Sequence, residues 1–264
     1  MTSAVFFLPV SFAFFMVAGY WIWTRRHGVR FRYRFLPSTL KAENRGIQPY
    51  TAMYPKLTEQ FREKFDWRSF YFLHTTIVEF RQFDGYSEAD RNKIRHLLAS
   101  VATQMTLFLP EACFTMIHTI VVYPKPYYSQ HSKQYHKGET NPKAGMIVLS
   151  WSGIAEGIAS LKDGLNLIIH EYAHALWIEH GVTSYLTFDS DAADHFQKVA
   201  MNELKLAAEV ESHFFRNYGL TNFHEFIAVA AENFFERPAE FEKELPQVYK
   251  AMVNLYQQDP LRIG

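Results

Sequence analysis

The feature that most constrains the fold of this chain is an apolar run at residues 167–176 that contains the pattern His-Glu-x-x-His. Neither Gly nor Pro occurs in residues 165–180, which favours a helix. In a helix, His170 and His174 lie one turn apart on the same face, separated by about 40°. Two imidazole nitrogens in this arrangement can bind one zinc ion. Glu171 then lies beside the metal, where it can take a proton from a bound water.

In a chain with 12 histidines, the ordinary alternative is that such a pattern lies on an exposed helix face. Here Leu-Ile-Ile precedes the pattern and Ala-Leu-Trp-Ile follows it, so we expect the helix to be buried nearly all round. Two imidazoles and a carboxylate inside a buried helix are costly unless a partner satisfies them. The sequence therefore favours a zinc site over an exposed helix face.

The composition narrows the class of protein. With 264 residues, the chain can bury a core in one domain, or in one domain with a smaller lobe. The 27 basic and 27 acidic side chains give zero net charge, which gives no support to nucleic acid as a partner. The single Cys113 excludes an internal disulfide framework.

Residues 4–23 contain no charged side chain. As a helix they would span about 30 Å, the thickness of the hydrocarbon core of a bilayer, so we predict a transmembrane anchor. Five arginines follow in residues 25–34, before the first acid at Glu43, and the positive-inside rule places this side in the cytoplasm. A cleaved signal peptide would instead carry its positive charge before the apolar run.

We expect three segments: the anchor at residues 1–27, a juxtamembrane connector at 28–55 and a folded domain at 56–264. Within the domain, residues 56–115 would form a helical lobe and residues 116–264 a catalytic core. Pro and Gly residues in the connector, and the helical spacing of apolar residues after it, support these boundaries.

The helical lobe contains two predicted helices. In the first, aromatic and aliphatic residues recur every three to five positions from Phe61 to Phe80. The second begins after Ser87, whose side chain suits the N-cap position, and continues to about Phe108. Pro110 then stops the helix.

The predicted core begins with two strands at residues 119–123 and 146–151, which are short and rich in β-branched residues. A loop of about twenty residues, 124–144, would connect them. Three further features are expected before residue 216: a short amphipathic segment at 153–163, Gly181 as the cap that ends the His170 helix, and a helix at 194–215.

A zinc hydrolase needs one more protein ligand and an open position for water. The apolar stretch 222–235 indicates a helix that carries Glu225 and Glu232 seven residues apart, hence on one face. Two carboxylates that face inward from an apolar helix need a cation or hydrogen-bond donors. One could bind zinc and the other could hold a ligating imidazole in its tautomer, and the spacing leaves open which does which.

A series of motifs extends from about residue 56 to the carboxyl end. Its residues are Ile147-Val148-Leu149-Ser150-Trp151, Asp163-Gly164-x-Asn166, His170-Glu171-x-x-His174-x-Leu176, Glu225-Phe226-x-Ala228-Val229-x-x-Glu232-x-Phe234-Phe235, Pro238, Phe241 and Leu255-Tyr256-Gln257-Gln258-Asp259-Pro260. In this order they resemble the Mlc titration factor A (MtfA) peptidases, which are zinc enzymes of the gluzincin type. The stretch Asn217-Tyr218-Gly219-x-Thr221-Asn222-x-x-Glu225-Phe226 is also similar to part of anthrax lethal factor, a related zinc peptidase.

The resemblance implies an α+β, mostly helical, zincin-like metallopeptidase domain with a small sheet, here preceded by one transmembrane helix. It implies that Zn²⁺ is the cofactor and that Glu225 is the third ligand, with His170 and His174. Glu171 would be the general base and acid.

The resemblance also assigns three supporting roles. Tyr218 takes the place of the tyrosine whose hydroxyl donates a hydrogen bond to the tetrahedral intermediate. Glu232 becomes the carboxylate that orients an imidazole. In peptidases of this type an edge strand just before the motif pairs with extended substrate, and residues 146–151 are the candidate.

The chain departs from the family pattern at two places. Trp177 stands where the family commonly has an Asp, three residues after the second His, and we expect Glu232 or Asp191 to meet any role of that Asp. The soluble members also lack an anchor like residues 4–23. This difference weakens the transfer of the soluble family's partner to this chain more than the transfer of its chemistry.

The sequence therefore predicts a zinc metallopeptidase with an aminopeptidase-like preference for peptide or protein substrates. It would be a single-pass protein of the bacterial inner membrane with its catalytic domain in the cytoplasm. The alternative is a binding protein that sequesters a cytoplasmic transcriptional repressor and has weak or vestigial peptidase activity. The intact set of His170, Glu171, His174 and Glu225 favours the enzyme. The natural substrate, exo- or endopeptidase preference and oligomeric state are left open.

Overall fold

The computed structural model describes residues 51–110, 113–129, 133–160, 162–183, 187–210 and 212–263. The predicted transmembrane helix at residues 4–23 lies outside these ranges and stays a prediction. Within them, no helix combines the length and the apolar character that a membrane crossing requires.

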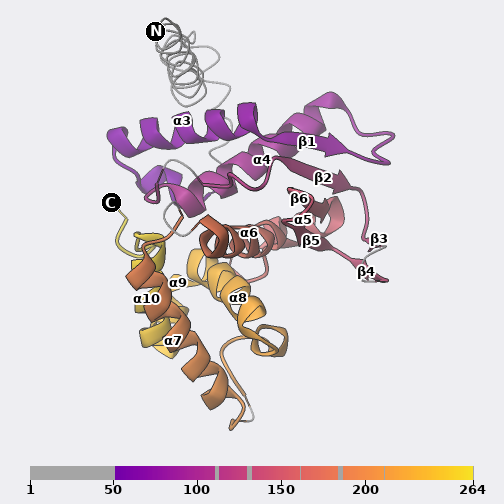
Figure 1. Cartoon of the computed structure of the whole chain (residues 1–264). Coiled ribbons are helices and arrows are strands. Elements are labelled where there is room, and N and C mark those ends of the chain that lie inside the picture. Colours follow the sequence, from indigo (N-terminus) through magenta and orange to yellow (C-terminus); the bar gives the residue numbers. More distant parts are fainter. Residues whose placement is uncertain are drawn as a thin grey trace, which may run out of the picture. The chain divides into compact units, whose positions relative to one another are not determined.

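The described elements alternate between helices and short strands in the first half, and are helical in the second half (Figure 1). In chain order they are η2 (Tyr54–Lys56), α3 (Glu59–Thr75), β1 (Ile77–Phe80), α4 (Glu88–Thr106), β2 (Thr119–Tyr123), β3 (Tyr127–Ser129), β4 (Gln134–His136), β5 (Gly138–Asn141), β6 (Met146–Ser150), α5 (Trp151–Ala159), α6 (Leu167–Thr183), α7 (Ser190–Ala207), η3 (Asn217–Leu220), α8 (Phe223–Glu236), α9 (Pro238–Glu244) and α10 (Pro246–Tyr256).

Four of the strands form one mixed sheet in the order β1-β2-β6-β5. The first three are parallel, with Ile77 opposite Thr119 and Thr119 opposite Met146. Strand β5 is antiparallel to β6 and forms the other end of the sheet. Strands β3 and β4 form a separate antiparallel pair. The described chain is therefore a mostly helical α+β domain with a small mixed sheet, as the sequence predicted.

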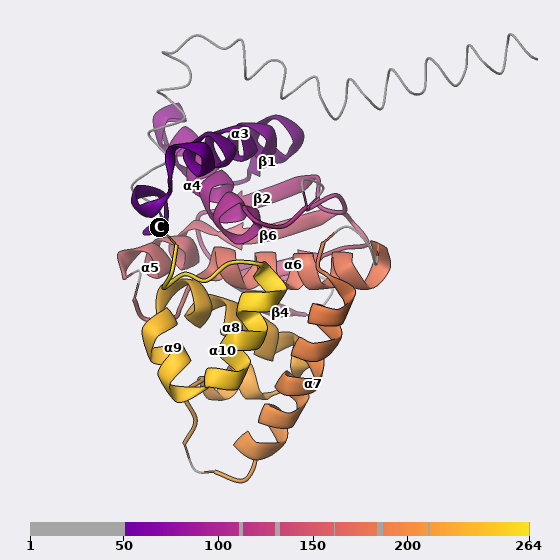
Figure 2. The ribbon, with the colours of Figure 1, turned by 90° about the vertical axis from the view of Figure 1, so that its left-hand side faces the viewer.

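Helix α6 lies at the centre of the compact unit formed by residues 47–264. It packs against α4, β5 and β6 on the side of the sheet and against α8 on the other side (Figures 1 and 2). Tyr172 of α6 is fully buried, and its hydroxyl donates to the carbonyl oxygen of Leu98 in α4 at 3.2 Å. The rings of Phe72 and Phe114 pack against it. The helix that carries the histidines is therefore fixed by core packing on most of its surface.

Most predicted elements are confirmed. The helix after Ser87 begins with a capping box, in which the Ser87 hydroxyl accepts from Asp90 N and the Asp90 carboxylate accepts from Ser87 N. The two predicted strands are β2 and β6, and the predicted helix at 222–235 is α8. The predicted division into segments at residues 28, 56 and 116 stays a prediction.

Three predicted boundaries are wrong. Residues 77–80 form strand β1 instead of continuing the first helix, because Ile77 and its neighbours pair with β2. Helix α6 continues past Gly181 to Thr183, so this glycine does not end it. Helix α7 ends at Ala207, well before the predicted residue 215, because Phe215 packs against α8 and α9 through Phe226 and Phe241.

The prediction of one irregular loop at 124–144 is also wrong, since three short strands lie within it. It contains the β3–β4 pair and all of β5, whose residues Gly138–Asn141 oppose Leu149–Met146 of β6. These strands are three or four residues long and rich in polar residues, so sequence periodicity does not reveal them.

Candidate metal centre

Helix α6 presents His170 and His174 from its first two turns. The side chain of Asn166 fixes the start of the helix, because its Oδ1 accepts from the backbone N–H groups of Ile168 and Ile169 at 3.1 and 3.2 Å. The His170 N–H donates to the Asn166 carbonyl oxygen at 2.9 Å, so both histidines occupy a regular helix whose first turn is capped.

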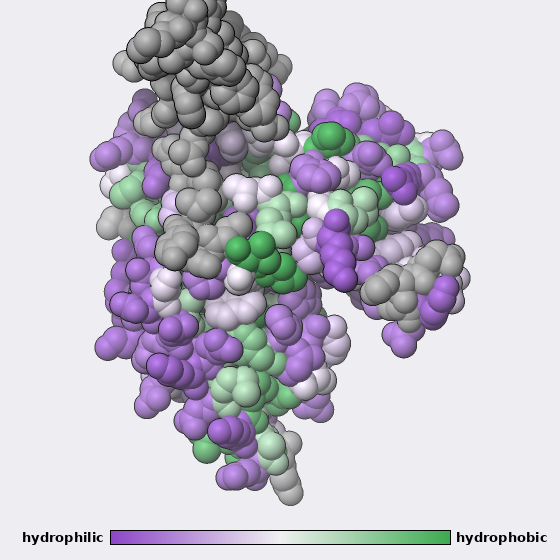
Figure 3. Space-filling view, in the orientation of Figure 1, coloured by the Kyte–Doolittle hydropathy of each residue, from purple (hydrophilic) through white to green (hydrophobic). Residues whose placement is uncertain are grey.

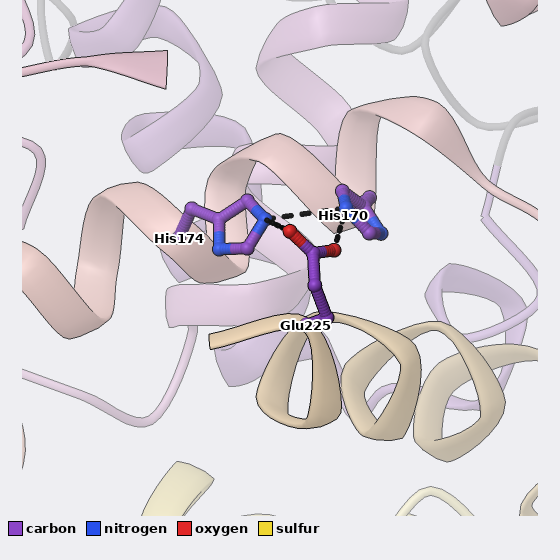
Figure 4. A group of neighbouring side chains, drawn as sticks. All are labelled: His170, His174 and Glu225. Carbon is purple, nitrogen blue, oxygen red and sulfur yellow. Dashed lines mark hydrogen bonds and ion pairs between the residues drawn. The ribbon is translucent and has the colours of Figure 1, made fainter. Parts of the chain in front are cut away.

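Helix α8 supplies Glu225 from its first turn. Asn222 is the N-cap of this helix, and its Oδ1 accepts from the backbone N–H of Glu225 at 3.1 Å. Helices α6 and α8 pack against each other, and the Glu225 carboxylate points between the two imidazoles (Figure 4).

The three side chains bring their donor atoms to one point. Nε2 of His170 lies 3.2 Å from Nε2 of His174 and 3.2 Å from Oε2 of Glu225. Oε1 of Glu225 lies 3.8 Å from Nε2 of His174. Donors bound tetrahedrally at 2.0–2.1 Å from one zinc ion lie about 3.3 Å from each other. The three donors therefore form a candidate metal-binding group.

The buried polar atoms of this group support a cation between them. Oε2 of Glu225 is buried without a hydrogen-bond partner, and two imidazole nitrogens converge on the same point. A shared cation would satisfy these lone pairs, which otherwise face one another. Two imidazoles and one carboxylate are a donor set that suits zinc and several other transition metals.

Glu232, two turns after Glu225, lies behind His170. Its Oε2 is 3.5 Å from Nδ1 of His170 and accepts from Nη2 of Arg216 at 2.7 Å. Its Oε1 accepts from the backbone N–H of Asn166 at 3.0 Å. Glu225 thus faces both imidazoles, whereas Glu232 faces one imidazole on the side away from the convergence point.

Glu171 lies against strand β5, with only 5% of its surface exposed. The hydroxyl of Thr140 lies 2.9 Å from Oε2 of Glu171 and 3.0 Å from its backbone oxygen. Burial raises the pKa of the Glu171 carboxyl to about 7, against the opposing effects of His170 and Thr140.

The two imidazoles have very different proton affinities. Burial acts to lower the pKa of His170, but the adjacent carboxylates of Glu225 and Glu232 outweigh it and raise the pKa to about 10. Burial and the adjacent charge of His170 lower the pKa of His174 to about 4. Burial acts to raise the pKa of Glu225, whereas the adjacent imidazoles of His170 and His174 hold it below its usual value.

Tyr218 comes from η3, the short helix just before α8, and its side chain is 54% exposed. Its ring lies 6.1 Å from the His170 ring, between centroids. Burial and the nearby charge of Glu225 raise the pKa of the Tyr218 hydroxyl to about 12. The phenol therefore remains a hydrogen-bond donor at neutral pH beside the candidate metal group.

Trp177 stands in an aromatic cluster and not in a polar one. Its ring packs against Phe188, Phe196 and Phe223. Two acids were expected to replace the family Asp. Glu232 contacts His170, whereas Asp191 lies in the first turn of α7 and lines a pocket that does not include the histidines.

A cleft of about 490 Å³ opens beside the group, and the space-filling view shows the surface hollowed between the strands and the helices below them (Figure 3). Its walls come from the β4–β5 segment, α5, the start of α6, and the stretch that carries Arg216 and Tyr218. The lining residues are Tyr135, His136, Lys137, Gly138, Gly153, Glu156, Gly157, Asp163, Leu165, Asn166, Leu167, His170, Glu171, Arg216, Tyr218 and Glu232.

Sequence reasoning missed the roles of Asn166, Arg216 and Thr140. Asn166 could have been found as an N-cap, because it stands immediately before an apolar helical run. Arg216 and Thr140 carry no sequence signal, because each contacts a residue that is distant in the chain.

Residues 23–257 match the family Peptidase M90, described as glucose-regulated metallo-peptidase. The chain belongs to this family. The match includes both histidines, the downstream glutamate and every strand of the sheet. The family assignment confirms the metallopeptidase resemblance drawn from the sequence.

Relatives of the chain include the uncharacterized protein slr2042 of Synechocystis sp., which is 27% identical over 231 residues, covering 79% of this chain and 80% of that protein. Mlc titration factor A from Yersinia pestis and Yersinia pseudotuberculosis is 30% identical over 162 residues. That match covers 54% of this chain and 59% of the relative, so it spans little more than half of either protein.

Proposed function

We propose that this chain is a zinc-dependent peptidase that hydrolyses peptide bonds with Glu171 as general base and acid. The convergence of His170, His174 and Glu225 from two helices, beside a buried carboxylate and an open cleft, carries the proposal. Membership of a metallopeptidase family supports the reaction class. Zinc is the expected ion because two imidazoles and one carboxylate with an open fourth position are typical of catalytic zinc sites.

A bound zinc ion would supply Lewis acidity and lower the pKa of a bound water to about 7. Glu171 takes the proton from the attacking water and returns it to the leaving amine. Burial raises the pKa of its carboxyl above the usual value, which helps it to keep the proton until the amine leaves. The Glu232 carboxylate lies 3.5 Å from Nδ1 of His170 and would favour the tautomer with hydrogen on Nδ1, so that Nε2 keeps a lone pair for the metal.

Tyr218 donates a hydrogen bond to the oxygen that becomes negative when the scissile carbonyl is attacked. Support comes from its position beside His170 and Glu225 and from its raised pKa, which keeps the hydroxyl protonated. One such donor typically contributes about 2.7–4 kcal/mol to the barrier reduction.

The extended substrate pairs with β5 in this proposal. The predicted edge strand at residues 146–151 is β6, which β2 and β5 cover on both sides, so that prediction was wrong. Strand β5 is the last in the sheet order, and Gly138 lines the cleft next to Glu171. The outer edge of β5 pairs with no other strand among the described residues, and its backbone groups can bind an extended peptide as an added strand.

The substrate preference and the location of the enzyme are further parts of this proposal. An aminopeptidase-like preference rests on the family resemblance. Attachment to the bacterial inner membrane, with the catalytic domain in the cytoplasm, rests on the apolar residues 4–23 and the arginines after them.

The experiment compares the full chain with Glu171→Gln, with zinc measured by elemental analysis and hydrolysis measured on peptides with free or acetylated amino termini. We expect stoichiometric zinc in both proteins and a loss of hydrolysis by at least about 100-fold in the variant. Glu244→Gln removes an exposed carboxylate on α9 and is the matched control, with activity unchanged. Cleavage confined to free amino termini supports an aminopeptidase.

A second candidate is binding of a transcriptional regulator. It rests on the relatives named Mlc titration factor A, to which part of this chain is similar. Zinc-loaded wild type without hydrolysis of any peptide in the series would contradict the enzyme and favour this candidate.

A further inference from the structure

Strand β5 contacts the proposed general base directly, although 31 positions separate Thr140 from Glu171 in the sequence. The Thr140 hydroxyl is 2.9 Å from Oε2 of Glu171 and 3.0 Å from its backbone oxygen. That backbone oxygen lies inside α6, where a helical N–H bonds to it. The single hydroxyl hydrogen of Thr140 can therefore serve the carboxylate.

Gly138 faces the same carboxylate from the same side of β5, since side chains two residues apart on a strand share a face. A Cβ at this position would lie 2.5 Å from Oε1 of Glu171 and 2.8 Å from Cδ1 of Leu167. Any larger residue would therefore displace the carboxylate or the helix that carries it. The absence of a side chain at Gly138 leaves room for Oε1.

We infer that Thr140 is a positioning residue for Glu171, and that Gly138 is the space in β5 that the second carboxylate oxygen needs. The inference rests on the proposed function and deepens it. Thr140 holds Oε2, which leaves Oε1 to accept the proton of the attacking water. A base acts efficiently only when it is held close to its productive geometry, and an error of 1 Å can lower the rate by about 100-fold.

In this arrangement, strand β5 contacts both the proposed general base and the substrate. The inner face of β5 holds Glu171, and its free edge is the surface proposed to pair with the peptide. The distance between the carboxylate and the scissile bond is therefore set by one rigid element, which is paired with β6 along its length.

The test compares Thr140→Val, which removes the hydroxyl at nearly constant shape, with Thr140→Ser, which keeps it. We expect kcat to fall by about 10- to 100-fold in Thr140→Val, with KM and zinc content unchanged, and to recover in Thr140→Ser. Thr106→Val is the matched control: this buried hydroxyl donates to the Ala102 carbonyl oxygen in α4, so kcat should stay at the wild-type value.

A second readout does not require turnover. In a double-mutant cycle on thermal unfolding, Thr140→Val should lower the midpoint in the wild-type background and have a smaller effect when Glu171 is already Ala. Equal effects in both backgrounds, or wild-type kcat in Thr140→Val, would overturn this inference alone. A zinc-loaded wild type that hydrolyses no peptide would overturn the proposed function, and the catalytic role of Thr140 with it.

Discussion

Glu225 and Glu232 are two carboxylates on the same side of one helix, and their surroundings give them different chemistry. Glu225 has two imidazole nitrogens in front of it and a buried oxygen without a partner. Glu232 receives hydrogen bonds from Arg216 and from the backbone of Asn166, which already satisfy a buried anion. The Arg216 guanidinium and the Asn166 N–H therefore compensate the charge of Glu232 without a metal ion.

Zinc affinity should therefore fall much further in Glu225→Ala than in Glu232→Gln. The first variant loses a ligand, whereas the second weakens the support of one ligand, an effect that typically lowers metal affinity by about 10- to 100-fold. Competition with a chromophoric chelator measures both. The reverse order would mean that the metal lies on the Glu232 side of His170.

Glu236, at the end of α8, should make stability depend on pH. Burial raises the pKa of its carboxyl from 4.5 to about 7, and the charges of Asp163 and Glu232 add to this. The folded state therefore holds a proton that the unfolded state loses, so this group lowers stability as pH rises from about 5 to about 7. Glu236→Gln removes this dependence and keeps an acceptor for the Asn166 amide.

The measurement is the unfolding midpoint of Glu236→Gln minus that of wild type, both zinc-saturated. We expect the difference to grow between pH 5 and pH 8, as the raised pKa of about 7 requires. A difference independent of pH would show that the carboxyl titrates at its usual value in the folded protein.

At the scale of elements, η3 and α8 approach each other so closely that η3 requires a glycine, Gly219, at the contact. A Cβ on Gly219 would lie 2.8 Å from Cβ of Val229, which is fully buried in α8. Tyr218 precedes Gly219 in η3, so the close contact between Gly219 and Val229 also fixes where Tyr218 lies.

Gly219→Ala should lower stability by about 1–3 kcal/mol, the usual effect of overpacking, and should reduce kcat by displacing Tyr218. Gly181→Ala is the matched control, because this glycine lies within α6 with open space around it. It should raise stability by about 0.5–1 kcal/mol, since Gly is unfavourable inside a helix. Urea unfolding measures both, and equal effects of the two variants would contradict the packing argument.

At the scale of the whole molecule, the candidate metal group joins two helices that lie far apart in the sequence. His170 and His174 come from α6 and Glu225 from α8, and the two helices pack through the core. A ligand that binds the folded state alone stabilises it, so metal binding and folding are linked.

Zinc at about 100 times its dissociation constant should stabilise the chain by about 2.7 kcal/mol and raise the unfolding midpoint by about 5–10 °C. A chelator should reverse the shift, and His174→Ala should show little of it because one of its three ligands is missing. Differential scanning calorimetry measures the shift. The same rise in His174→Ala would place the metal elsewhere.

The sequence by itself determined the features that depend on neighbouring residues. The His170 helix, the capping box at Ser87, strands β2 and β6 and helix α8 all follow from local spacing and capping chemistry. The metallopeptidase class followed from motifs in order, and the family match confirms it.

Only the tertiary structure decided which groups meet across the chain. It distinguished Glu225 from Glu232, and it replaced β6 with β5 as the edge of the sheet. It also brought Thr140 to Glu171. Each of these depends on the strand order or on how α6 and α8 cross. Neither can be inferred from sequence periodicity, because the pairing partner lies many residues away.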